Sequence, residues 1–147
     1  MRTRFTFIVA MAAVVLLAMP ARSYAGAKQS APVTVIPYTI GSTPWVTVYG
    51  SLADTRNSAD NTSYITCSIG AYSYADGTVL PSANCQAYDA VHNLSAYCYT
   101  TNPVMIQTIQ SITGDSYVNF YYASSSTTST CTGMSVTKSS MYSPKTP

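Results

Sequence analysis

The sequence contains no glutamate and only one histidine, His92, and charged residues make up just 8% of it. A zinc site of the Cys/His type needs several ligands, and one histidine leaves only cysteines to supply them. We therefore expect no metal and no cofactor. With so little charge, the surface must be covered largely by Ser, Thr, Asn, Gln and Tyr, which is common among exported β proteins.

Long apolar runs are also missing, apart from one at the N-terminus. Residues 5–19 form an apolar stretch that follows Arg2 and Arg4 and precedes small residues at Ser23 and Ala25. The stretch has roughly 15 residues, whereas a membrane-spanning helix needs about 20. The pattern is typical of a secretory signal peptide that is cleaved after Ala25. We expect residues 1–25 to be removed and a secreted chain without a membrane span to remain, extracellular or, in a Gram-negative host, periplasmic.

Loss of the signal peptide also changes the charge balance. Four cationic side chains remain against five aspartates, a formal net charge of −1, although the full sequence has a net charge of +2. Binding to nucleic acid needs a basic patch that neutralises phosphates. We therefore expect no nucleic-acid partner.

Alternating β-branched and aromatic residues recur along the mature chain and indicate strands. A helical spacing of apolar residues occurs once, over about residues 103–112, where Asn102 suits the N-cap and Pro103 the first turn. We expect a mainly β fold, a single-domain antiparallel β-sandwich or barrel-like sheet with one short helix. The expected organisation is a flexible start over 26–31, one domain over 32–140 and a C-terminal tail over 141–147.

Four cysteines in an exported chain predict two disulfides. A turn centred on Val91 and His92 places Cys85 directly opposite Cys98, and His92 is then a solvent-exposed turn residue. With a two-residue turn at Asp76-Gly77, the side chains of Cys67 and Cys85 point to opposite sides of the sheet. These registers predict the pairs Cys85–Cys98 and Cys67–Cys131, but a one-residue shift of a turn reverses the argument.

Tyrosine is abundant, with 13 residues. On a strand, a row of tyrosines offers rigid apolar area and hydroxyl groups that suit sugar rings or protein surfaces. The strand patterns place many tyrosines opposite the core face, and we predict a binding face for polysaccharide or a cell-surface protein that includes Tyr72, Tyr74, Tyr88, Tyr97, Tyr99, Tyr117 and Tyr121.

Two other functions compete with a binding module. The chain could be a self-assembling extracellular subunit, in which residues 32–40 or the tail add a strand to a neighbour. It could also be a small hydrolase that uses a pair of its aspartates, Asp54, Asp60, Asp76, Asp89 and Asp115, as acid and base. No phosphate loop, nucleophile elbow or paired-ligand helix occurs, so we favour a non-enzymatic binding or structural module.

The run "GSLADTRNSADNTSYITC", with "CQAYDA", "TTNP" and "GDSYVNFYY" later in the chain, resembles a class of small exported bacterial proteins with four cysteines. The shared pattern is G-S-L-x3-R-N-S-A-D-N-x2-Y-I-x-C, and the likeness extends over nearly all of the mature chain. The resemblance implies export, disulfides and a compact domain. The class has no assigned reaction, so no functional residue is transferred by it.

Overall fold

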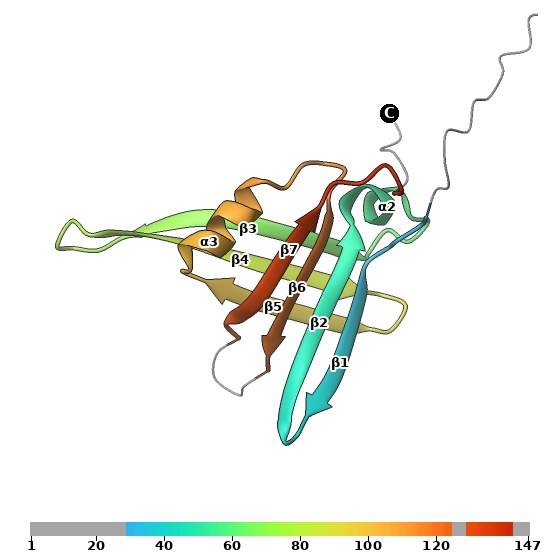
Figure 1. Ribbon diagram of the computed structural model, residues 1–147, viewed down its shortest axis with the longest axis horizontal. Coiled ribbons are helices and arrows are strands. Elements are labelled where there is room, and N and C mark those ends of the chain that lie inside the picture. The colour runs from blue at the N-terminus through green and yellow to red at the C-terminus, as the bar shows by residue number, and fades with distance from the viewer. Residues whose placement is uncertain (1–28, 125–128, 143–147) are drawn as a thin grey trace, which may run out of the picture.

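The computed structural model describes residues 29–124 and 129–142 (Figure 1). Over these residues the elements are, in chain order, β1 Thr34–Ile40, β2 Thr43–Ser51, α2 Leu52–Asn57, β3 Tyr64–Ser73, β4 Val79–Asp89, β5 Leu94–Thr100, α3 Pro103–Gln110, β6 Tyr117–Ala123 and β7 Cys131–Thr137. The strands form a four-stranded sheet in the order β1-β2-β6-β7 and a three-stranded sheet in the order β3-β4-β5. All strand pairs within the two sheets are antiparallel.

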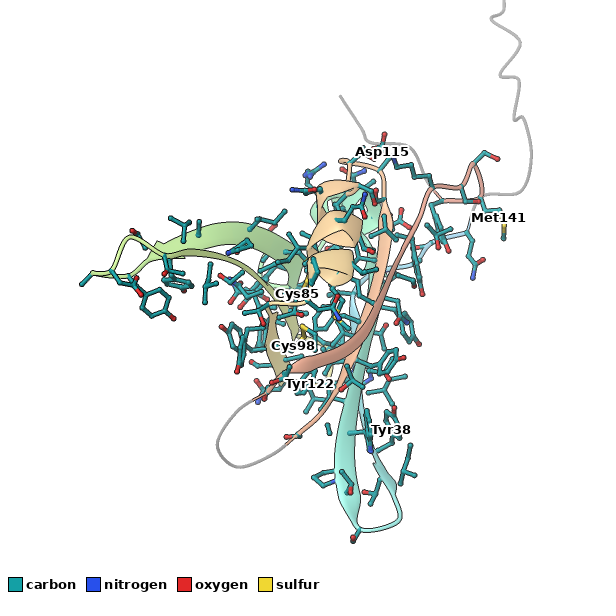
Figure 2. The ribbon with its side chains drawn as sticks, turned by 60° about the vertical axis from the view of Figure 1, so that its left-hand side comes forward. Tyr38, Cys85, Cys98, Asp115, Tyr122 and Met141 are labelled. Carbon is teal, nitrogen blue, oxygen red and sulfur yellow. A yellow bond between two sulfur atoms is a disulfide. The ribbon has the colours of Figure 1, made fainter. Side chains whose placement is uncertain are left out.

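The hydrophobic core lies between the two sheets, whose strands cross one another (Figure 1). Phe120 and Val48 of the four-stranded sheet are fully buried, as are Cys85 and Cys98 of the other. Figure 2 shows these cysteines in the middle of the molecule, with Tyr122 pointing toward them. The prediction of a mainly β fold with two facing antiparallel sheets is therefore confirmed, without closure into a barrel.

The predicted helix is confirmed as α3, and Ile106 and Ile109 bury its apolar side against the core. The Asn102 side chain accepts hydrogen bonds from the first turn, as an N-cap should. A second short helix, α2, was not predicted, since the sequence indicated only one helix, at about residues 103–112. Ser51 caps α2 through its Oγ, which accepts a hydrogen bond from the Asp54 N–H at 3.2 Å. Ser51 and Asp54 have the spacing of a capping box, a signal that marks helix starts.

The β3–β4 hairpin has a different register from the one predicted. Tyr74 N–H donates to the Thr78 carbonyl at 2.8 Å, so the loop has three residues, and Gly77 adopts a φ of 83° at its end. Three-residue loops of this kind use a glycine in the left-handed conformation. The extra loop residue shifts the pairing by one position and places Cys67 directly opposite Cys85.

Both predicted disulfides were wrong: the bonds are Cys67–Cys85 and Cys98–Cys131. The predicted β4–β5 register is confirmed, and Cys85 does lie opposite Cys98. The N–H groups of Tyr97 and Tyr99 face away from β4, so the backbone of Cys98 faces β4 and Cys85 and Cys98 form a hydrogen-bonded pair. Side chains in such a pair are farther apart than in a non-hydrogen-bonded pair. The Cys67–Cys85 rung is of the closer type, with a Cα–Cα distance of 4.1 Å. Cys98 instead bonds to Cys131 and connects the two sheets.

The first and last described residues are attached to the domain. Gln29 N–H donates to the Met141 carbonyl at 2.7 Å, and Ala31 exchanges hydrogen bonds with Asp54 and Ser51. Gln29 and Ala31 of the expected flexible start are therefore hydrogen-bonded to the domain. The predicted signal peptide, residues 26–28 and residues 143–147 of the tail lie outside the described residues.

Candidate functional site

The outer surface of the four-stranded sheet carries a group of aromatic side chains. In β2, Val48 is buried in the core, so Trp45 and Tyr49 point to the opposite side. In β6, Phe120 is buried and Tyr121 points outward for the same reason. Strand register then brings the outward residues of neighbouring strands next to one another. We call this surface the outer aromatic face; it comprises Tyr38, Trp45, Tyr49, Tyr117, Tyr121 and Tyr142.

The rings of the outer aromatic face support one another. Trp45 and Tyr121 have ring centroids 6.4 Å apart, and Tyr49 stacks on Tyr117 at 6.2 Å. Tyr117 in turn stacks on Tyr142 at 4.7 Å, nearly parallel. These distances lie in the range of favourable aromatic pairs. The rings therefore form two packed groups, Trp45 with Tyr121 and Tyr117 with Tyr49 and Tyr142, and within each group a ring limits the motion of its neighbour.

Gly133 makes room for one of these rings. It lies opposite Tyr121 in the β6–β7 pair, and a Cβ atom at this position would collide with the Tyr121 ring. The ring thus lies across the glycine, flat against the sheet. A glycine covered by a cross-strand aromatic ring is a known stabilising arrangement in β-sheets. Here it also fixes how Tyr121 is presented to solvent.

The outer aromatic face carries no charge. The charged side chains among the described residues lie on α2, in turns, at the end of β4 and after β7. Burial raises the pKa of Tyr117, and the neighbouring Tyr142 and Tyr49 raise it further, so this phenol stays neutral at physiological pH. The face therefore combines apolar rings with hydroxyl groups. Figure 2 shows Tyr38 on the side of the β1–β2 hairpin away from Cys85 and Cys98.

The seven predicted binding tyrosines occupy three separate regions. Tyr117 and Tyr121 belong to the outer aromatic face. The outer side of the three-stranded sheet carries Tyr88, Tyr97 and Tyr99, and the projecting end of the β3–β4 hairpin carries Tyr72 and Tyr74.

Sequence reasoning missed four members of the outer aromatic face, namely Tyr38, Trp45, Tyr49 and Tyr142. The alternation in "WVTVYG" places Trp45 and Tyr49 on one side of a strand, and this signal was available. The sequence contained no signal that Tyr142 stacks on Tyr117, because that contact joins the tail to β6.

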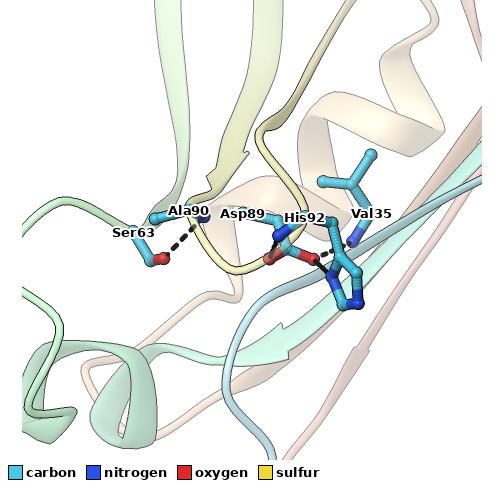
Figure 3. A network of polar contacts seen from close by, with 5 residues as sticks. All are labelled: Val35, Ser63, Asp89, Ala90 and His92. Atoms are coloured by element: carbon cyan, nitrogen blue, oxygen red, sulfur yellow. Dashed lines mark hydrogen bonds and ion pairs between the residues drawn. The ribbon is translucent and has the colours of Figure 1, made fainter.

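The only histidine is held by a buried aspartate at the β4–β5 turn (Figure 3). The Asp89 carboxylate accepts hydrogen bonds from His92 Nδ1 at 2.7 Å, from His92 N–H and from Val35 N–H. Burial opposes ionisation of Asp89, but the hydrogen bonds from His92 and Val35 outweigh it and lower its pKa. The ring of His92 is 58% exposed, as expected for a turn residue.

A cleft of about 360 Å³ beside this turn contains Asp60, Asp89 and His92, so it is the natural place to look for hydrolase chemistry. Hydrogen bonds from Ser63 and Thr62 lower the pKa of Asp60 to about 2. Asp60 forms no ion pair with the nearby Arg56. A glycosidase needs one carboxylic acid with a raised pKa as proton donor. Both carboxylates in the cleft have lowered values. The Ser63 hydroxyl accepts a hydrogen bond from Ala90 N–H at 3.0 Å (Figure 3).

Comparison with known proteins yields no relative: no protein-family model, no curated protein and no solved structure matches the chain. Among residues 29–124 and 129–142, no helix is both long and apolar enough to cross a lipid bilayer. Within the same residues, no three His, Cys, Asp or Glu side chains are grouped so that they could hold a metal ion. The outer aromatic face is the surface whose chemistry most clearly suits a ligand.

Proposed function

We propose that this chain is an exported, non-enzymatic binding module whose outer aromatic face stacks on neutral polysaccharide. The observation that carries the proposal is the uncharged layer of mutually packed rings on one side of the four-stranded sheet. Tyr and Trp rings bury large apolar area at low entropic cost and keep a polar group for hydrogen bonding. Sugar rings have apolar faces bordered by hydroxyl groups, and they match this combination.

Neutral ligands suit the face better than charged ones. A uronic acid, a phosphate or a nucleic acid is held mainly by Arg and Lys side chains. The outer aromatic face offers none, and the raised pKa of Tyr117 keeps that phenol protonated at neutral pH. A protein partner with an apolar surface is the other occupant that such a face accepts.

Two disulfides support the proposed location outside the cytoplasm, because such bonds persist in oxidising compartments. We propose export by cleavage of residues 1–25. Intact mass measurement of the chain recovered from the periplasm and from the medium of the producing cells tests this. A mass that begins at Gly26 is expected, whereas a chain retained in the cytoplasm with residues 1–25 still attached contradicts the proposal.

Retention on insoluble polymers tests the binding function. The disulfide-intact mature chain is mixed with cellulose, chitin, insoluble β-1,3-glucan or the producer's own cell envelope, and the bound fraction is measured. Trp45→Ala removes the largest ring of the face, and we expect retention to weaken at least about tenfold. Tyr97→Ala is the matched control, because Tyr97 is half-exposed on the other sheet.

Gly133→Ala provides a second test that leaves every aromatic residue in place. The added Cβ meets the far end of the flexible Tyr121 side chain, so the ring must swing away while the backbone remains largely undisturbed. We expect this variant to lose retention as Tyr121→Ala does. If Tyr97→Ala abolishes retention and the two changes on the four-stranded sheet do not, the binding surface is the three-stranded sheet and the proposal is wrong.

A further inference from the structure

The outer half of the β3–β4 hairpin projects from the molecule as a two-stranded arm (Figure 1). Every residue from 68 to 81 is exposed. Much of this exposed surface is apolar, supplied by Ile69, Tyr72, Tyr74, Val79 and Leu80. Asp76 at the tip is the one charged residue in the segment. The arm is thus an apolar extension with a single acidic end.

The outer edge of the arm has unpaired backbone groups. Tyr74 N–H donates to Thr78, so the backbone groups of Tyr74 face β4. Because N–H and C=O groups point to alternate sides along an antiparallel strand, those of Ile69, Ala71 and Ser73 face away from β4. This alternation makes Cys67 and Cys85 a non-hydrogen-bonded pair, and their short Cα–Cα distance of 4.1 Å agrees with it. The β3 edge therefore presents three residues that can pair with another strand.

The free edge of β1, which the sequence indicated as a site for strand addition, is protected. Val35 N–H points away from β2 and is already bound by the Asp89 carboxylate at 3.2 Å. Pro37 is the next residue with the same orientation, and proline has no N–H to donate. Proline on an edge strand is a common defence against unwanted pairing. Strand addition at β1 is accordingly disfavoured.

The β5 edge is occupied as well. Tyr97 N–H donates to the Tyr122 hydroxyl at 3.2 Å, and Tyr99 N–H donates to the Ser129 carbonyl at 2.9 Å. Two of the three outward-facing donors of β5, those of Tyr97 and Tyr99, are thus satisfied within the chain. The β3 arm differs from these two edges because it has neither a proline nor a covering partner at its outward positions.

A basic groove lies at the other end of the same β3 edge. It has a volume of about 250 Å³ and is lined by Arg56 of α2 and by Tyr64 and Ile65 at the start of β3, among others. Arg56 is exposed and forms no ion pair within the described part of the chain. One edge therefore has an acidic tip at one end and a basic groove at the other.

We propose that two copies of this chain associate by antiparallel pairing of their β3 edges. A two-fold interface uses the same surface on both partners, and an edge with opposite charges at its two ends is self-complementary under that symmetry. If the two-fold axis passes through Gly70, Ile69 lies opposite the partner's Ala71. In this register the residues whose backbone groups face away from β4 pair with the equivalent residues of the partner. The same register carries Asp76 to the partner's Tyr64, beside the groove that contains the partner's Arg56.

Sedimentation of the disulfide-intact mature chain over a wide concentration series tests the pairing. A reversible dimer is expected, and Ala71→Pro should weaken it at least about tenfold, because proline removes an outward donor while the β3–β4 ladder keeps all of its bonds. Thr39→Pro is the matched control at an outward position of the β1 edge, and it should leave the dimer unchanged. A chain that is monomeric throughout the series, or a dimer insensitive to Ala71→Pro, overturns the proposal.

Charge reversal tests the register separately. Arg56→Asp and Asp76→Arg should each weaken the dimer several-fold, and the double variant should recover most of the loss. If a proline variant fails to fold, amide exchange of the native chain decides instead. The amides of Ile69, Ala71 and Ser73 should exchange more slowly as concentration rises, and exchange that is independent of concentration at all three contradicts the pairing.

Discussion

Replacing Cys98 and Cys131 together by alanine is expected to lower the free energy of unfolding by about 4 kcal/mol. The bond closes a loop with a sequence separation of 33 residues, so its loss greatly increases the conformational freedom of the unfolded chain. The bond also joins β5 of one sheet to β7 of the other, and both cysteines are buried in the core. The paired replacement thus removes the covalent connection between the sheets.

The matched control is the paired replacement of Cys67 and Cys85. This bond joins neighbouring strands of one sheet with a separation of 18, and its loss should cost about 3 kcal/mol. Urea denaturation of the oxidised proteins measures both values. If the free energy of unfolding falls by less than about 1 kcal/mol when Cys98 and Cys131 are replaced, that bond is not the main covalent connection that stabilises the packing of the two sheets.

Digestion on the N-terminal side of aspartate identifies the disulfide partners directly. Cleavage before Asp60, Asp76, Asp89 and Asp115 places each cysteine on a different peptide. Without reduction, peptide 60–75 should be recovered linked to 76–88, and peptide 89–114 linked to the one that begins at residue 115. A link between 76–88 and 89–114 would instead show the Cys85–Cys98 pair.

Replacing Asp89 by alanine should lower the free energy of unfolding by about 3 kcal/mol at pH 7. Its buried carboxylate binds Val35 N–H of β1 and two groups of His92, so it connects the four-stranded sheet to the β4–β5 turn. Asp89→Asn retains the shape and one acceptor oxygen, and about 2 kcal/mol is expected. His92→Ala removes only an exposed partner and should cost less than about 1 kcal/mol.

The contribution of Asp89 should depend on pH. Its pKa is lowered in the folded protein, so the stabilisation is complete above the unfolded value of about 3.9 and disappears as the pH falls through the folded value. Denaturation curves of the wild type and Asp89→Asn at several pH values check this. The stability difference between the two proteins should shrink as the pH falls through the lowered pKa of Asp89. A difference that stays constant as the pH is lowered until both proteins unfold would falsify the role of the ionised carboxylate.

Local patterns predicted much of the fold. Alternating residues identified the strands, and Asn102 with Pro103 located the start of α3. The errors in register and disulfide pairing came from the length of one loop, a local feature that changes contacts along the whole hairpin. One additional loop residue before Thr78 shifted the β3–β4 register and thereby changed both disulfides. The α2 helix was missed because its six residues contain only one large apolar side chain, Leu52, and so show little periodicity, although Ser51 carried its capping signal.

The candidate site was less predictable. Alternation determines that neighbouring tyrosines on a strand share a side, but not which strands lie in the same sheet. Tyr97 and Tyr121 were therefore grouped, although they belong to different sheets. The arrangement of Trp45 against Tyr121 depends on the β2–β6 pairing, which joins segments far apart in the sequence.

Fluorescence of Trp45 tests the proposed binding function most directly, because Trp45 is the chain's sole tryptophan and lies on the outer aromatic face. The mature chain is titrated with soluble oligosaccharides of whichever polymer retains it, and Tyr121→Ala is titrated in parallel. We predict a saturable change in Trp45 emission that is weakened at least about tenfold in Tyr121→Ala. Saturable binding by calorimetry with no change in Trp45 emission would contradict the account, because the sugar would then be bound away from this face.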